Sequence, residues 1–331
     1  MPPARQIRGA LTALVTPFTP AGALDEDAFR RLVQRQIDLG IDGLVLAATT
    51  GESPALSSEE REWIFATAVD MASARPSRQR IRIVANTGTN DTASSIRASR
   101  RAAQLGVDAV MAVAPYYNRP DQRMLDAHFR AIADESDLPL IVYNVPSRTG
   151  SNVEAATLLR LAEHPRIAAV KEASGNLDQI ATILRDRPAP FSVLAGDDAW
   201  TLPVLALGGD GVISTCANEI PAEMTAMCCA AFSGDFDSAR RIHERWLPLM
   251  KANFVGGPNP VPVKSALSLM GLMSGMVRLP LLPLDELNQA RMRTVLEAAG
   301  LLPGSGAAAA SRPARPARIA SEIRTTVGAH A

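Results

Sequence analysis

Residues 167–176 read IAAVKEASGN, in which a short apolar run ends abruptly in a lysine and a glutamate. The run has no polar alternation, which is typical of a strand in a parallel sheet that is covered on both faces. Seven further runs of this kind occur, and helical periodicity follows each of them. The eight runs are Leu11–Val15, Gly43–Ala47, Ile81–Ala85, Ala109–Val113, Leu140–Tyr143, Ile167–Val170, Ser192–Ala195 and Gly211–Ser214.

Eight strand–helix units in succession predict an α/β fold of the closed (β/α)8, or TIM barrel, type. A doubly wound sheet normally has fewer strands and a glycine-rich phosphate loop, and no GxGxxG motif occurs here. We expect the barrel in residues 1–220 and a helical C-terminal region packed on it in residues 221–302. Residues 303–331 are rich in Ala, Arg and Pro and predict a flexible tail.

The composition favours a small-molecule enzyme over a nucleic-acid or membrane protein. The 331 residues include 34 basic and 34 acidic side chains, so no excess of positive charge would hold the chain on nucleic acid. No segment supplies the roughly 20 apolar residues that a membrane span needs. The three cysteines and four histidines lack the spacing of metal ligands or of a secreted disulfide framework. We therefore expect a cytoplasmic protein that uses neither a metal nor a cofactor.

Lys171 is the candidate nucleophile. The carboxyl ends of barrel strands meet at one face, so reactive side chains are expected immediately after the apolar runs. Lys171 follows one run directly, and its amine would therefore point into the mouth of the barrel. Desolvation there would lower its pKa and leave a neutral amine that can attack a ketone. The alternative is that Lys171 is a solvated or paired charge, as is common for a lysine at a strand end. The neighbouring motifs favour the nucleophile.

Hydroxyl side chains are expected around this amine. The chain has three tyrosines, Tyr116, Tyr117 and Tyr143, all at or after the ends of runs that would face the mouth. Phenol hydroxyls can relay protons during imine formation, especially with a threonine hydroxyl between them. Thr49 and Thr50 lie in a predicted turn whose backbone N–H groups suit a carboxylate. Aromatic packing and a plain turn are the structural alternatives.

Arg148, which follows the fifth run, has a planar guanidinium that can bind a second carboxylate in a bidentate manner. A solvated surface arginine is the alternative interpretation. Residues 259–264, NPVPVK, predict a stiff connector with a structural role.

Taken together, these motifs resemble those of the dihydrodipicolinate synthase and N-acetylneuraminate lyase family over about residues 7–295. The motifs that carry the resemblance are Thr49-Thr50-Gly51-Glu52, Pro115-Tyr116-Tyr117-Asn118, Tyr143-Asn144-Val145-Pro146-Ser147-Arg148-Thr149-Gly150, Lys171-Glu172-Ala173-Ser174-Gly175-Asn176, Gly196-Asp197-Asp198 and Gly211-Val212-Ile213-Ser214.

The resemblance implies a catalytic role for four of these residues. Lys171 would form a Schiff base with pyruvate, while Tyr143, Thr49 and Tyr117 would relay protons. Tyr117 would reach in from a neighbouring subunit, which implies a homo-oligomer, a dimer of dimers. The reaction implied is the condensation of pyruvate with L-aspartate 4-semialdehyde to 4-hydroxy-tetrahydrodipicolinate, in the lysine and diaminopimelate pathway.

The resemblance also implies how the substrates are held. Thr50 would help to bind the pyruvate carboxylate, and Arg148 would bind the carboxylate of the aldehyde. Gly196 and the Ile213 carbonyl would line the site. Arg148 favours a synthase, because sialic-acid lyases usually lack an arginine at this point. Enzymes that act on keto-deoxy sugar acids remain the alternative, and a catalytically dead binding barrel is disfavoured because the lysine and tyrosines are retained.

Two residues depart from the pattern of relatives that lysine inhibits. Those relatives have a histidine and a glutamate where this chain has Ser58 and Ser94. We therefore expect weak or absent feedback inhibition by lysine.

Overall fold

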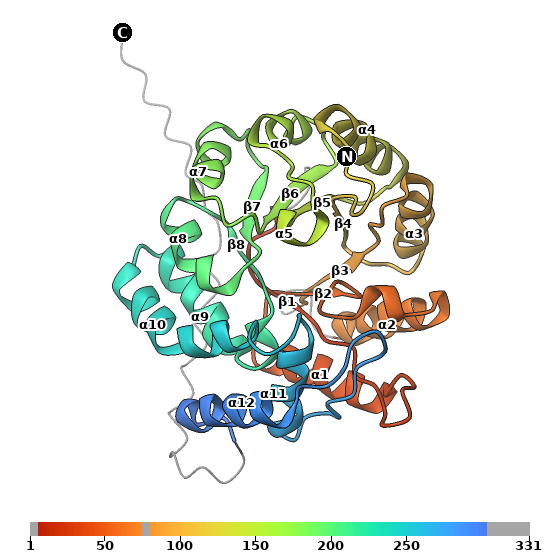
Figure 1. Cartoon of the computed structure of the whole chain (residues 1–331). Coiled ribbons are helices and arrows are strands. Elements are labelled where there is room, and N and C mark those ends of the chain that lie inside the picture. The colour runs from red at the N-terminus through yellow and green to blue at the C-terminus, as the bar shows by residue number, and fades with distance from the viewer. Residues whose placement is uncertain (1–5, 75–79, 303–331) are drawn as a thin grey trace.

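The computed structural model describes residues 6–74 and 80–302, and its strands form one closed parallel barrel (Figure 1). Strands that are neighbours in the chain pair with each other, and the last strand pairs with the first. The predicted barrel fold is therefore confirmed. The strands are β1 (Gly9–Ala13), β2 (Gly43–Leu46), β3 (Arg82–Asn86), β4 (Ala109–Val113), β5 (Leu140–Asn144), β6 (Ile167–Glu172), β7 (Ser192–Ala195) and β8 (Gly211–Ser214).

Helices form a ring outside the strands in Figure 1. The sequence supplies their N-caps: Ser57 and Glu60, for example, form a reciprocal capping box at the start of α2. The helices of this ring are α1 (Glu26–Asp38), α2 (Ser58–Ser73), α3 (Thr92–Gln104), α4 (Gln122–Glu135), α6 (Ala155–Ala162), α7 (Leu177–Asp186), α8 (Thr201–Ala206) and α9 (Pro221–Phe232). Short helices lie in the loops at the carboxyl ends of the strands: η1 (Ser53–Ala55), α5 (Pro146–Thr149), η2 (Asp198–Trp200) and η3 (Cys216–Asn218).

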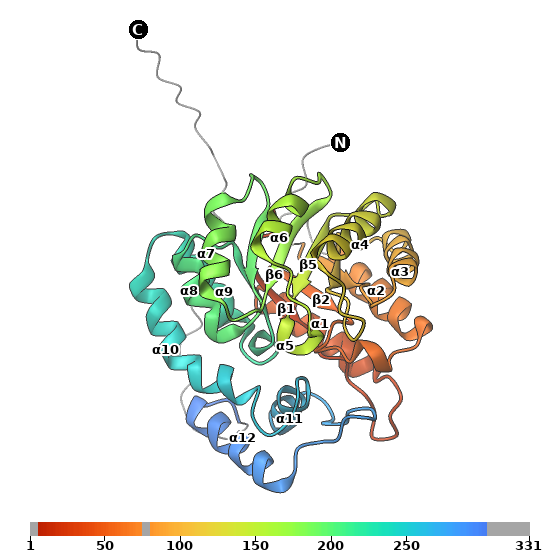
Figure 2. The same ribbon diagram turned by 45° about the horizontal axis from the view of Figure 1, so that its top comes forward.

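The C-terminal region adds α10 (Phe236–Ala252), α11 (Val261–Leu269) and α12 (Glu286–Ala299). Figure 2 shows α11 and α12 beyond the end of the barrel at which α5 lies. Because α5 follows the carboxyl end of β5, these helices lie on the side of the predicted active site. The predicted tail, residues 303–331, lies outside the described residues.

Two local predictions were wrong. The first strand lies two residues earlier than expected, because the Val15 N–H donates to the Asn218 side chain at 3.1 Å and the chain has left the sheet there. Residues 261–264 do not form a stiff connector but the first turn of α11. Pro262 is tolerated there because the N–H groups of a first helical turn have no intrahelical acceptor.

The buried apolar side chains form two layers, one between the strands and the helices and one inside the barrel. Side chains alternate along a strand, so residues two apart share a face. In β6, Ala169 packs inside the barrel and Val170 packs outside it. The alternation therefore directs Lys171 into the barrel. In β5, Ile141 and Tyr143 belong to the same inner layer.

None of the helices in residues 6–74 and 80–302 is both long enough and apolar enough to cross a membrane.

Candidate active site

Lys171 lies near the carboxyl end of β6, and its side chain is 5% exposed. Its strand neighbours are Tyr143 on β5 and Leu194 on β7. The amine Nζ lies 4.2 Å from the centroid of the Tyr143 ring. Among the described residues no carboxylate forms an ion pair with this amine, so no ion pair fixes it in the protonated form.

Burial shifts the protonation equilibrium of this amine. It lowers the pKa of Lys171 to about 8, an effect that the Asp198 carboxylate opposes and the charge of Arg148 reinforces. With such a pKa, roughly a quarter of the amines are neutral at about pH 7.5, against about 0.1% of ordinary lysine side chains. Lys171 is therefore suited to attack a carbonyl carbon at neutral pH.

Tyr143 supplies a buried phenol beside this amine. Burial raises the pKa of Tyr143 to about 12, although a hydrogen bond with Thr49 and the charge of Arg148 oppose this effect. The phenol therefore keeps its proton at neutral pH and can donate it to a leaving hydroxide. The structure thus brings Lys171, Tyr143 and Thr49 together, as the sequence predicts.

Thr50 is 2% exposed and lies in the turn that follows β2. The turn is closed by its own backbone, since the N–H groups of Gly51 and Glu52 donate to the carbonyls of Ala48 and Thr49. Those two N–H groups are therefore not available to a carboxylate. The Thr50 hydroxyl remains as a donor and accepts a hydrogen bond from Asn259 at 3.0 Å.

Gly196 and Ile213 lie at the barrel mouth and in the inner layer, respectively. A Cβ atom on Gly196 would lie 2.7 Å from the Ala173 Cβ and 3.1 Å from the Lys171 Cγ. Glycine therefore suits this position because the Ala173 side chain and the stem of Lys171 occupy the adjacent space. Ile213 is 1% exposed in β8.

Two predicted residues are not part of this buried cluster. Arg148 lies exposed in α5, where its charge still lowers the pKa values of Lys171 and Tyr143. Tyr117, in the loop after β4, is 92% exposed and has a left-handed backbone with φ of 73°. A single chain therefore does not bring the Tyr117 phenol into the buried cluster around Lys171.

The structure adds a residue to which the sequence interpretation gave no role. Asp198, two residues after Gly196, is buried near Lys171 and accepts hydrogen bonds from the backbone N–H groups of Thr215 and Cys216. Burial raises the pKa of Asp198 to about 6. Its position in the loop that follows the predicted strand Ser192–Ala195 was the signal that could have identified it.

In the described parts of the chain, no three His, Cys, Asp or Glu side chains are grouped so that they could hold a metal ion. A desolvated lysine at the carboxyl end of a barrel strand, next to a protonated tyrosine, defines the class of barrel enzymes that capture a carbonyl substrate on an amine. Within that class, the chain belongs to the dihydrodipicolinate synthetase family, whose model matches residues 6–299.

Similar proteins cover almost the whole described chain. A 4-hydroxy-tetrahydrodipicolinate synthase from Moorella thermoacetica is 50% identical over 292 residues, which is 88% of this chain and 98% of the relative. The crystal structure of dihydrodipicolinate synthase from Aquifex aeolicus has a TM-score of 0.85 and 39% identity, covering 89% of this chain and 99% of that one. The dihydrodipicolinate synthase from Acinetobacter baumannii, solved in complex with pyruvate, has a TM-score of 0.86 and 37% identity. The match covers 90% of this chain and 100% of that one.

Proposed function

We propose that this protein is a 4-hydroxy-tetrahydrodipicolinate synthase that condenses pyruvate with L-aspartate 4-semialdehyde in lysine biosynthesis. The observation that carries the proposal is the unpaired Lys171 amine, which burial inside the barrel mouth keeps partly neutral. The 50% identity to the Moorella synthase supports the choice of reaction.

The reaction begins with attack of the neutral Lys171 amine on the ketone carbon of pyruvate. The resulting carbinolamine loses its hydroxyl as water, and the protonated Tyr143 phenol supplies the proton through the Thr49 hydroxyl. The iminium then draws electrons from the methyl carbon, which loses a proton to the Tyr143 phenolate through the Thr49 hydroxyl and becomes an enamine. The enamine forms a carbon–carbon bond with the aldehyde, whose oxygen takes up a proton by the same path and becomes a hydroxyl. The amino group of that substrate then displaces the Lys171 amine and closes the ring, and its surplus proton returns to the phenolate.

The substrate carboxylates are held by different residues. The Thr50 hydroxyl donates to the carboxylate of pyruvate, while Gly196 and the Ile213 carbonyl line the pocket around it. Arg148 lies exposed at the mouth, where the second substrate arrives, and has no ion-pair partner within the described residues. Its planar guanidinium suits the carboxylate of L-aspartate 4-semialdehyde.

Borohydride trapping tests this proposal. The protein is incubated with pyruvate and sodium borohydride, and peptide mass spectrometry follows. We expect one reduced pyruvyl group per chain, attached to Lys171, and turnover of pyruvate with L-aspartate 4-semialdehyde. Absence of the adduct would rule out the mechanism. Trapping of pyruvate without turnover of this aldehyde, but with turnover of sugar aldehydes, would instead assign a related aldolase.

We further propose that Tyr117 completes the proton relay in a neighbouring subunit of a homo-oligomer. In a single chain the Tyr117 side chain is exposed and its backbone is strained. Both observations support contact of this ring with a neighbouring subunit. Co-expression of a Lys171→Arg chain with a Tyr117→Phe chain tests this. Mixed dimers would contain one complete site, so random pairing is expected to recover about a quarter of the wild-type activity. No recovery in purified mixed dimers would place Tyr117 in its own chain's site.

Feedback inhibition by lysine is expected to be weak. Ser58 is exposed, and the Ser94 hydroxyl accepts a hydrogen bond from Arg97 at 2.7 Å. A positive guanidinium thus stands where a glutamate would attract the ammonium group of lysine, and like charges repel. Millimolar lysine should therefore leave turnover almost unchanged. The Ser58→His, Ser94→Glu double variant should gain sensitivity, whereas strong inhibition of the unmodified enzyme at sub-millimolar lysine would contradict the expectation.

A further inference from the structure

The turn that carries Thr49 and Thr50 has an unfavourable backbone conformation at both ends. Ala47 has φ of 50° and Glu52 has φ of 55°, in the left-handed region that residues with a Cβ rarely adopt. Between them, a Cβ on Gly51 would lie 3.1 Å from the Ala47 Cα and 3.2 Å from the Leu14 carbonyl oxygen. Such a conformation persists only where surrounding contacts fix it.

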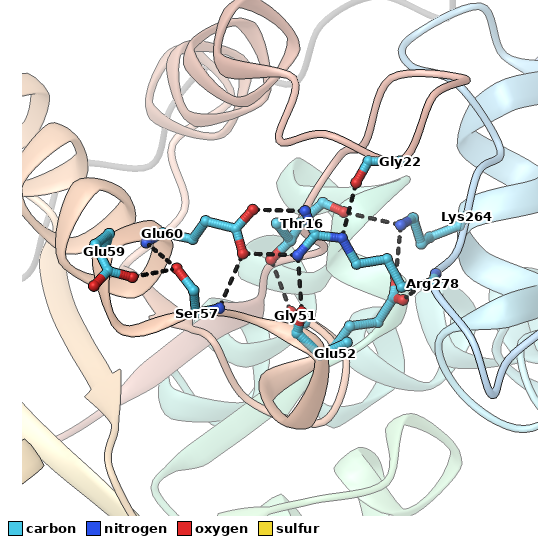
Figure 3. A network of polar contacts seen from close by, with 10 residues as sticks. Thr16, Gly22, Gly51, Glu52, Ser57, Glu59, Glu60, Lys264 and Arg278 are labelled. Carbon is cyan, nitrogen blue, oxygen red and sulfur yellow. Dashed lines mark hydrogen bonds and ion pairs between the residues drawn. The ribbon is translucent and has the colours of Figure 1, made fainter.

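Buried charges from the C-terminal region fix one end of the turn (Figure 3). The Glu52 carboxylate, 3% exposed, accepts from the Lys264 Nζ at 2.6 Å and from the Arg278 backbone N–H at 2.9 Å. Lys264 itself is 0% exposed. The Arg278 guanidinium extends the network to the Glu60 carboxylate of α2 in a bidentate ion pair.

Three further hydrogen bonds hold the middle of the turn, two of them directly and one through Thr16. Lys264 also donates to the Thr16 carbonyl at 2.9 Å, and the Thr16 hydroxyl donates to the Gly51 carbonyl at 2.8 Å. Asn259, just before α11, donates its amide to the Thr50 hydroxyl at 3.0 Å. The turn is thus held through residues that follow it by 209 and 212 positions in the chain.

The bond from Asn259 also determines where the Thr50 hydroxyl can point. A hydroxyl has one proton to donate and accepts along its lone pairs. Because one lone pair of Thr50 faces the Asn259 amide, its proton must point elsewhere. It is therefore available to a carboxylate in the barrel mouth.

We propose that Asn259 and Lys264 are positioning residues that set the affinity for pyruvate by holding the Thr49–Gly51 turn. This inference rests on the proposed function, since it takes the pyruvate carboxylate as the ligand of Thr50. The C-terminal helical region then acts on the reaction through α11, although neither residue touches the substrate.

Asn259→Ala gives the first test, with Asn288→Ala, another asparagine of the C-terminal region, as the control. The concentration of pyruvate that half-saturates borohydride trapping should rise about tenfold, as expected for loss of one oriented hydrogen bond in a buried site. The KM for the aldehyde and the melting temperature should change little, and the Asn288 variant should behave as wild type. An unchanged half-saturation in Asn259→Ala would overturn the inference.

Lys264→Met gives the second test, with Lys251→Met, an exposed lysine of α10, as the control. The single variant leaves Glu52 buried without its partner, so Glu52→Gln with Lys264→Met is prepared beside it to remove the unpaired charge. In both variants, the concentration of pyruvate that half-saturates trapping of the folded chains should rise. A purely structural role would instead lower the melting temperature and the trapped fraction while leaving the half-saturation of the folded chains unchanged.

The two proposals fail in different ways. If the wild-type protein does not trap pyruvate at Lys171, the proposed function fails and this inference falls with it. If the wild type traps pyruvate saturably but the Asn259 and Lys264 variants do so with the same half-saturation, only the positioning role is wrong.

Discussion

Replacing Lys171 with arginine is expected to reduce turnover at least about 1,000-fold, because the covalent route through an imine is lost. The guanidinium stays protonated in proteins and cannot add to a ketone at neutral pH, so the variant keeps the charge but not the nucleophile. Lys171→Met removes the charge as well and should be equally inactive. Its melting temperature should not fall, since the cost of burying an amine is removed with it.

Steady-state turnover and peptide mapping after borohydride reduction measure this effect. Lys251→Arg is the matched control, because Lys251 is exposed in the last turn of α10 and its variant should keep turnover within about twofold. Substantial turnover in Lys171→Arg, or a pyruvyl adduct on another lysine, would refute the assignment. Lys264 is the only other buried lysine in the described chain. Its ion pair with Glu52 favours the charged ammonium, which cannot form an adduct with pyruvate.

Tyr143→Phe is expected to lower kcat about 100- to 1,000-fold while the pyruvate adduct still forms, more slowly, at full stoichiometry. Phenylalanine keeps the ring that lies 4.2 Å from the Lys171 amine but removes the hydroxyl that transfers protons. The variant therefore separates proton transfer from substrate capture. The rate of adduct formation is measured by adding borohydride at several times after mixing with pyruvate, and turnover assays give kcat.

Thr49→Val tests whether Thr49 belongs to the same proton path. The double variant with Tyr143→Phe should then lose little more than Tyr143→Phe alone, because residues that act as one unit are not additive. Thr182→Val is the matched control, since that exposed hydroxyl donates to the Asp178 carbonyl of its own helix. Fully additive losses would show that Tyr143 and Thr49 act independently.

The periodicity of the sequence was sufficient to predict the barrel, because parallel strands covered on both faces leave continuous apolar runs. The same rule predicted where the candidate residues would gather, since the carboxyl ends of all strands meet at one face. It brought Lys171, Tyr143 and Thr49 together correctly although they come from three different strand–loop units. The first strand was misplaced because the side chain of Asn218, far along the chain, takes the Val15 N–H.

What the sequence determined by itself is therefore the barrel and the residue types at its mouth, both of which follow from local patterns. Only the tertiary structure decided the protonation of those residues and the contacts that fix their positions. The Lys171 pKa depends on how many neighbours exclude water from the amine, and no local pattern records that number. Lys264 of α11 binds Glu52 and Asn259 binds Thr50, and both residues come from a segment that from sequence alone was interpreted as a connector. A buried ion pair between residues 212 positions apart is invisible in the sequence, because its energy arises from the shared exclusion of water after folding.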